Sequence, residues 1–196
     1  MSELNQLLLK LDYKTNFNEH DFYLSKSNSK AYNLINRWPD WDKKILNISG
    51  EKFSGKSHLA NIFKLKSKAF LIKGNKINNS IFKSLKLYES IIIDDFEECK
   101  EEELLYSIFN LIDQDNKYML INSLKPINEI KFNLPDLISR SKNCLYTQIE
   151  NPDDELLFAI ILKNFSDRQI KIEKKIINFI ISRIDRSYRN IDEFIY

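Results

Sequence analysis

Glycine and cysteine are scarce in this chain of 196 residues, and long apolar runs are absent. The two cysteines, Cys99 and Cys144, have neither metal-ligand nor redox spacing, which favours reduced side chains in a cytoplasmic protein. No run of about 18 apolar residues occurs, so we expect no membrane-spanning helix. Glu3 lies in an N-terminus without a long apolar run after basic residues, so we do not expect a signal peptide either.

A strong charge of either sign is also missing. The 30 lysines and arginines nearly balance the 28 acidic residues, which leaves a formal net charge of +2. This balance argues against a strongly basic nucleic-acid surface and against an acidic tail, and it leaves room for a local basic patch. Apolar residues make up 43% of the chain, which predicts a folded core.

Short apolar runs alternate with helix-like segments before Pro152. Strands that alternate with helices are typical of an α/β fold, in which helices cover both faces of a parallel sheet. A further helical pattern over residues 29–38 precedes the first run. We therefore predict a five-stranded parallel sheet, with strands near 45–48, 69–72, 91–93, 118–121 and 144–146 and helices near 56–66, 76–87, 101–114 and 126–140.

After Pro152 the pattern is helical throughout, over residues 153–164, 172–186 and 190–196. No internal repeat or low-complexity linker separates the parts. We predict an N-terminal segment over residues 1–20, an α/β nucleotide-binding domain over 21–150 and a small all-helical lid over 151–196.

Two of the three glycines lie in one stretch, residues 50–57, which matches G-x-x-x-x-G-K-[ST] at every fixed position. Gly50 and Gly55 let the backbone wrap a phosphate with N–H groups pointing inward. Lys56 would reach the β- and γ-phosphates, and Ser57 would place a hydroxyl on Mg²⁺. The apolar run before the stretch and the helical pattern after it argue against a chance match. We expect nucleotide contacts from this loop and its neighbour, namely Gly50, Glu51, Lys52, Phe53, Ser54, Gly55, Lys56, Ser57 and His58.

A second motif is the apolar run of residues 91–93 that ends in Asp94 and Asp95. A buried strand that ends in a carboxylate is what the metal side of such a site requires. Asp94 would hold Mg²⁺ together with Ser57, and Asp95 would polarise the attacking water. The alternative is a strand that runs into an acidic turn without a catalytic role.

The order of these motifs resembles the AAA+ ATPase domain of the DnaA family of bacterial replication initiators, through Gly-Lys-Ser-His-Leu-Ala at 55–60 and Ile-Asp-Asp-Phe at 93–96. More specifically, the chain resembles Hda, the group of DnaA-related regulators. Leu-Pro-Asp-Leu-Ile-Ser-Arg at 134–140 is similar to the family segment that carries the arginine finger. Asp-Arg-Ser-Tyr-Arg-Asn at 185–190 is similar to the second sensor.

The resemblance implies roles for residues that the chain alone would not single out. Arg140 would be an arginine finger that acts in trans on a neighbouring subunit's nucleotide, and Arg189 would contact the bound nucleotide from the lid. Asn122 lies on the strand of the first sensor, and Tyr23, Leu24 and Asn28 fall where the family approaches adenine. The plain alternatives are a helix-end salt bridge for Arg140 and a surface charge for Arg189.

The N-terminal hexapeptide at residues 6–11 resembles the sliding-clamp-binding peptide of Hda, with Lys10 where the family often has proline. Gln6 would form a hydrogen bond, and apolar anchors would fill a groove. An amphipathic edge strand or a helix start would explain the same pattern. The residues expected at the clamp are Gln6, Leu7, Leu9 and Leu11.

These resemblances predict a regulator that binds ATP or ADP with Mg²⁺, docks on the DNA polymerase III beta sliding clamp and stimulates ATP hydrolysis by DnaA. Because the sequence stops at Tyr196, we expect no helix-turn-helix domain and no sequence-specific DNA binding. The alternatives are a self-sufficient ATPase, such as a helicase loader, and a nucleotide-gated adaptor without hydrolysis. The sequence leaves a homodimer open.

Overall fold

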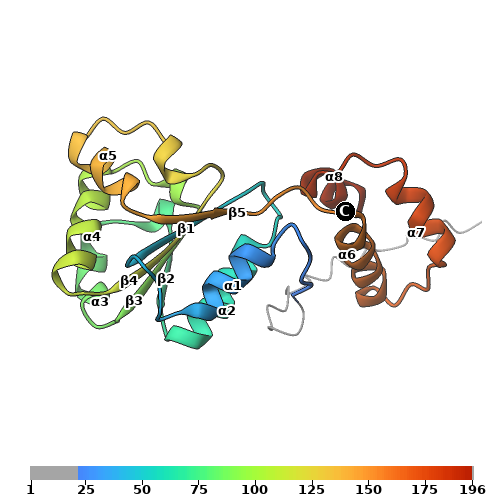
Figure 1. Ribbon diagram of the computed structural model, residues 1–196, viewed down its shortest axis with the longest axis horizontal. Helices are drawn as coiled ribbons and strands as arrows, with labels where there is room; N and C mark the ends of the chain where they lie inside the picture. The colour runs from blue at the N-terminus through green and yellow to red at the C-terminus, as the bar shows by residue number, and fades with distance from the viewer. Residues whose placement is uncertain (1–21, 196) are drawn as a thin grey trace, which may run out of the picture.

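A computed structural model of the chain describes residues 22–195. The hexapeptide with Gln6, Leu7, Leu9 and Leu11 therefore lies outside the described residues. The core is a five-stranded, entirely parallel sheet in the order β2-β3-β4-β1-β5 (Figure 1). This confirms the predicted α/β fold. The strands are β1 (Ile45–Ser49), β2 (Phe70–Lys73), β3 (Ser90–Asp94), β4 (Tyr118–Ser123) and β5 (Leu145–Gln148).

Helices connect the strands and cover both faces of the sheet (Figure 1). Those around the sheet are α1 (Ser29–Arg37), α2 (Lys56–Ser67), α3 (Phe82–Leu85), α4 (Glu102–Gln114) and α5 (Pro135–Lys142). Short 3-10 turns add η2 (Gly74–Lys76), η3 (Asn79–Ile81), η4 (Phe96–Glu98) and η5 (Ile127–Glu129). The chain then continues through α6 (Asp154–Asp167), α7 (Lys174–Ile181) and α8 (Tyr188–Ile195).

The prediction of one helix over residues 126–140 is wrong for the first half of that range. The chain forms the η5 turn and an irregular segment there, before α5 begins. Leu134 precedes Pro135 and has extended backbone angles, as expected for a residue before proline. The carboxylate of Glu102 accepts hydrogen bonds from the backbone N–H groups of Asn133 and Leu134. These contacts satisfy two backbone N–H groups of the segment outside a helix. Likewise, the region predicted as one helix over 76–87 forms η3 followed by the four-residue α3.

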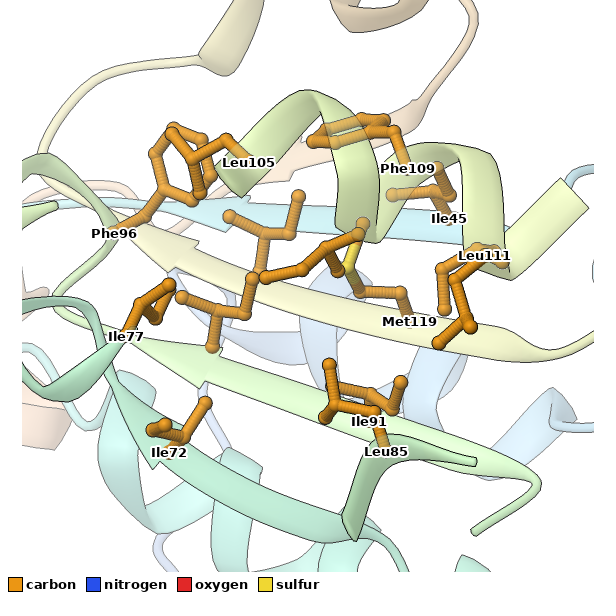
Figure 2. Packing of buried hydrophobic residues seen from close by; sticks show 14 of the residues in the cluster. Ile45, Ile72, Ile77, Leu85, Ile91, Phe96, Leu105, Phe109, Leu111 and Met119 are labelled. Carbon is orange, nitrogen blue, oxygen red and sulfur yellow. The ribbon is translucent and has the colours of Figure 1, made fainter. Parts of the chain in front are cut away.

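Alternate residues of the central strands enter two separate cores. Ile91, Ile93 and Met119 belong to the core under α3, α4 and α5, which also contains Phe96 and Phe109 (Figure 2). Ile92 and Leu120 face the opposite core under α1 and α2. Successive side chains of a strand point to opposite faces, so one apolar run supplies both cores.

The C-terminal helices α6, α7 and α8 form a small core of their own, at the side of the molecule that the carboxyl ends of the strands face (Figure 1). Leu157, Ile161, Ile177 and Ile191 are buried there. The Asp153 carboxylate caps α6 by accepting a hydrogen bond from the Leu156 N–H at 2.8 Å. α7 is shorter than the predicted helix of residues 172–186, and α8 begins at Tyr188 rather than at residue 190. Among the described residues, no helix has the length and apolar content needed to cross a membrane.

Candidate functional site

The loop between β1 and α2 contains the backbone conformations that its glycines predict. Gly55 caps α2 with a left-handed φ of 92°, where a side chain would be strained. A Cβ on Gly50 would lie 3.0 Å from the Ser54 Oγ and 3.2 Å from the Ile149 Cβ. Both glycines are therefore required by the course of the loop around the start of α2.

Lys56 is buried at the base of this loop and is held by the loop itself. Its Nζ donates to the carbonyl oxygens of Gly50 and Glu51, at 2.7 and 2.6 Å. An ammonium has three donors, so one N–H bond stays available for a phosphate oxygen. Burial lowers the pKa of Lys56, while nearby carboxylates oppose this effect, Glu97 and Asp94 foremost.

Ser57, Asp94 and Asn122 meet directly beneath the loop. The Ser57 Oγ donates to one oxygen of the Asp94 carboxylate at 2.9 Å, and the Asn122 Nδ2 donates to the other at 2.8 Å. The parallel register of β3 and β4 places Asn122 beside the end of β3. The two donors orient a carboxylate that is almost fully buried. Ser57 and Asp94, the pair expected to hold Mg²⁺, thus lie in contact, and Asn122 of β4 holds the same carboxylate. Their role in binding a metal stays a prediction.

The donor set fits Mg²⁺ only if a nucleotide supplies further oxygens. Within residues 22–195, no group of three or more histidine, cysteine, aspartate or glutamate side chains is placed to hold a metal ion by itself. Mg²⁺ is usually bound through one or two carboxylates, substrate phosphates and water. Ser57 and Asp94 match that pattern. Two buried oxygens nearby, the Asn122 Oδ1 and the Ser54 Oγ, have no hydrogen-bond partner within residues 22–195. The Asn122 oxygen can accept a hydrogen bond from a bound group, and the Ser54 hydroxyl can donate or accept one.

Asp95 lies at the pocket and is held by the end of β2. Its carboxylate forms an ion pair with the Lys73 Nζ at 3.0 Å, and its backbone is left-handed with φ of 52°. This hydrogen bond raises the pKa of Lys73. The third glycine, Gly74, touches the same turn, since a Cβ there would lie 2.3 Å from the Asp95 carbonyl oxygen. The role of Asp95 as a base stays a prediction.

A pocket of about 780 Å³ extends from the loop toward the C-terminal helices. Residues 52–58 and Asp95 form one side, together with the predicted Tyr23 and Asn28. Leu24 is half exposed and does not line it. The sequence did not predict the apolar residues that line the rest of the pocket. Most of them are helix residues whose sequence context resembles that of any core position. This apolar wall comprises Phe22, Leu156, Ala159, Ile160, Tyr188 and Ile191.

The two arginines singled out by the resemblance lie outside this pocket. Arg189 is exposed, and its Nε donates to Glu193 one helical turn away at 2.8 Å. Arg140 hydrogen-bonds to Asp113 and Asn110 of α4 and borders a small hollow beside Lys43 and Ile45, near the amino end of β1. Both proposed roles stay predictions. The position of Arg140 excludes contact with a nucleotide bound in its own chain's pocket.

Known proteins are similar to this chain in sequence and in fold. The chain is 24% identical over 205 residues to the chromosomal replication initiator protein DnaA of Borreliella afzelii, covering 91% of this chain and 42% of the relative. It is 32% identical over 106 residues to DnaA of Chlorobaculum tepidum, covering 52% of this chain and 22% of the relative. The chain thus spans less than half the length of these relatives. No protein-family model matches it.

The structure of AMPPCP-bound DnaA from Aquifex aeolicus superimposes with a TM-score of 0.73 at 17% identity, over 93% of this chain and 64% of that one. The chain has the fold of a DnaA-like AAA+ domain. The finer resemblance to Hda stays a prediction.

Proposed function

We propose that this DnaA-like chain binds an adenine nucleotide with Mg²⁺ and takes part in controlling the initiation of chromosome replication. The observation that carries the proposal is the cluster of Ser57, Asp94 and Asn122 directly beneath the Lys56 loop. The fold shared with DnaA and the AMPPCP bound in the Aquifex aeolicus structure support an adenine nucleotide rather than another phosphate ligand.

Different residues of the pocket would bind the phosphates, the Mg²⁺ ion and the base of the nucleotide. The N–H groups of residues 51–57 and the positive end of α2 would face the phosphates, with the third Lys56 N–H bond beside them. Asp94 and Ser57 would hold Mg²⁺, which when bound neutralises phosphate charge. The apolar wall of Phe22, Ile160 and Ile191 would cover the base and exclude water.

We propose further that the chain is a regulator that stimulates ATP hydrolysis by DnaA. Because Arg140 lies away from its own pocket, its guanidinium could act only on a nucleotide held by another subunit. Gln6, Leu7, Leu9 and Leu11 would bring the chain to the sliding clamp. This part of the proposal rests on the sequence resemblance, since those residues lie outside the described part of the chain.

The decisive experiment measures DnaA-bound ATP hydrolysis with clamp, DNA and this protein as wild type, Arg140→Ala or Asp113→Asn. Arg140 contacts Asp113, so Arg140→Ala removes this contact between α4 and α5, whereas Asp113→Asn removes only its ion pair and keeps an oxygen acceptor. We expect Arg140→Ala to abolish stimulation and Asp113→Asn to retain it, because the second variant keeps the guanidinium. Equal losses would reduce Arg140 to a structural residue and contradict the finger role.

Two controls complete the design. Arg140→Ala should bind ADP as tightly as the wild type, because Arg140 does not line the pocket. A Gln6→Ala/Leu9→Ala variant should lose stimulation only where the clamp is required. A self-sufficient ATPase is the second candidate, since Asp95 lines the pocket. It predicts hydrolysis by this chain alone that Asp95→Asn removes.

A further inference from the structure

Glu51 occupies a position that the loop motif leaves free, and its side chain points away from the phosphate side. The motif fixes Gly50, Gly55, Lys56 and Ser57 and sets no requirement at residue 51. The Glu51 side chain does not line the pocket. It faces the start of α8 instead, although 137 positions separate it from Tyr188 in the sequence.

The Glu51 carboxylate caps α8 with both oxygens. Oε1 accepts from the Ser187 hydroxyl at 2.7 Å, and Oε2 accepts from the Tyr188 backbone N–H at 2.9 Å. The first N–H groups of a helix have no partner within the helix, and a carboxylate there is also favoured by the helix dipole. The Ser187 Oγ in turn accepts from the Asn190 N–H at 3.4 Å. Glu51 and Ser187 together thus satisfy two backbone donors of α8.

The backbone of the same residue holds the phosphate-binding lysine. The Glu51 carbonyl oxygen accepts the hydrogen bond from the Lys56 Nζ. One residue therefore joins Lys56 to the first turn of α8, through its carbonyl on one side and its carboxylate on the other. That turn carries Tyr188, and the next turn carries Ile191, which also lines the pocket.

We propose that Glu51 is a positioning residue that fixes α8 to the phosphate loop and thereby sets how the C-terminal helices face a bound nucleotide. The proposal rests on the proposed nucleotide binding for its functional consequence. The cap itself is independent of that function. Tyr188 also packs in the core under α1 and α2, and its hydroxyl donates to the Glu150 carbonyl at 3.2 Å. The packing of Tyr188 holds α8 near the sheet, and the Glu51 cap fixes the position and orientation of the first turn of α8.

The test compares Glu51→Ala, Glu51→Gln and a matched control, Arg186→Ala. Glutamine keeps an acceptor for the Tyr188 N–H and a donor for the Ser187 hydroxyl, so it preserves both contacts without the charge. Arg186 lies just before α8 but pairs with Asp154 of α6, so its loss leaves the Glu51 cap intact.

Amide hydrogen exchange of α8 is measured first, without nucleotide. We expect the Tyr188 N–H of Glu51→Ala to exchange about tenfold faster than that of the wild type, because its acceptor is gone. Glu51→Gln and Arg186→Ala should stay within about twofold of the wild type. Unchanged exchange in Glu51→Ala, or equal acceleration in Arg186→Ala, would overturn the cap.

Titration with Mg²⁺-ADP and Mg²⁺-AMPPCP then measures the consequence for the site. We expect Glu51→Ala to bind about tenfold more weakly and Glu51→Gln to bind nearly as tightly as the wild type. Normal affinity in Glu51→Ala would overturn the role in the nucleotide site. If the wild type itself bound no nucleotide, the proposed function would fail, while the exchange measurement would still decide whether Glu51 fixes α8.

Discussion

Phe53 holds a left-handed backbone conformation in the loop between β1 and α2, with φ of 66°. Such a conformation is costly for a residue with a Cβ and nearly free for glycine. The ring is 60% exposed, so packing does not compensate for the strain. At the residue scale, therefore, the backbone conformation of the loop suits its two glycines and is unfavourable for Phe53.

Phe53→Gly should raise the free energy of unfolding by about 1 kcal/mol, because it removes the left-handed strain. Urea denaturation followed by circular dichroism measures the change. The control is Phe53→Ala, which removes the ring and keeps the strain, and which should be nearly neutral. A gain of the same size in Phe53→Ala would show that the ring, rather than the backbone, is unfavourable.

Lys56 carries the charge that would bind a phosphate at this site. Burial lowers its pKa from the ordinary value of 10.5. The protonated form binds phosphate, so ADP affinity should fall as the pH rises through the depressed pKa, below the pH at which an exposed lysine would titrate. Calorimetric titrations from about pH 7 to about pH 10, which lies just below the ordinary lysine pKa, would measure this. A constant affinity over that range would contradict the dependence on Lys56.

At the scale of elements, the connection before α5 depends on a single carboxylate at the start of α4. Hydrogen bonds from the backbone N–H groups of Asn133 and Leu134 lower the pKa of Glu102 below its ordinary value of 4.5. The folded state therefore favours the ionised form. The stabilisation is fully present above the unfolded pKa and is lost as the pH falls through the folded pKa.

Glu102→Gln should destabilise the protein at pH 6, and the difference from the wild type should shrink as the pH is lowered toward pH 3 (about one unit or more below an ordinary glutamate pKa). Chemical denaturation at several pH values checks this. Glu103→Gln removes an equal charge from the same helical turn. If both variants showed the same pH dependence, the helix dipole rather than the contacts to Asn133 and Leu134 would be responsible.

At the scale of the whole molecule, the pocket lies between the sheet and the C-terminal helices, which are joined by Leu156 and Tyr188 in the core under α1 and α2. The sheet carries its own apolar cores, while Ile161 and Ile177 are buried among α6, α7 and α8. A nucleotide in the pocket would touch both parts, since Leu156, Ile160 and Ile191 face the loop residues. A substitution that destabilises the C-terminal core should therefore weaken nucleotide binding without destabilising the sheet.

Ile161→Ala leaves a cavity that should cost about 2–5 kcal/mol within that core. We expect faster amide exchange over α6, α7 and α8 and weaker ADP binding, with little change for the amides of β3 and β4. The position does not line the pocket, so lost contact with the ligand cannot explain the effect. Equal loss of protection in β3 would instead show that the chain unfolds as one unit.

The sequence by itself determined the features that depend on local chemistry. Gly50, Gly55, Lys56 and Ser57 predicted a tight loop at the start of a helix, because a backbone that wraps an anion needs those residues at that spacing. Phosphate binding by this loop stays a prediction. Apolar runs that end in turn residues predicted all five strands, and the signal is strongest for β1, β3 and β4, which are buried on both faces and must be apolar along their length. The predicted helix over residues 126–140 failed where contacts distant in the sequence decide, since Glu102 satisfies the backbone near Pro135.

Only the tertiary structure decided which distant residues meet. The register of β3 and β4 brought Asn122 to Asp94, and the return of α8 to the sheet brought Ser187 and Tyr188 to Glu51. The same return placed Ile191 in the wall of the pocket and left Arg189 on the surface. Sequence patterns report the periodicity of one element at a time. The contacts that complete this site form between elements, and they depend on how the helices pack against the sheet.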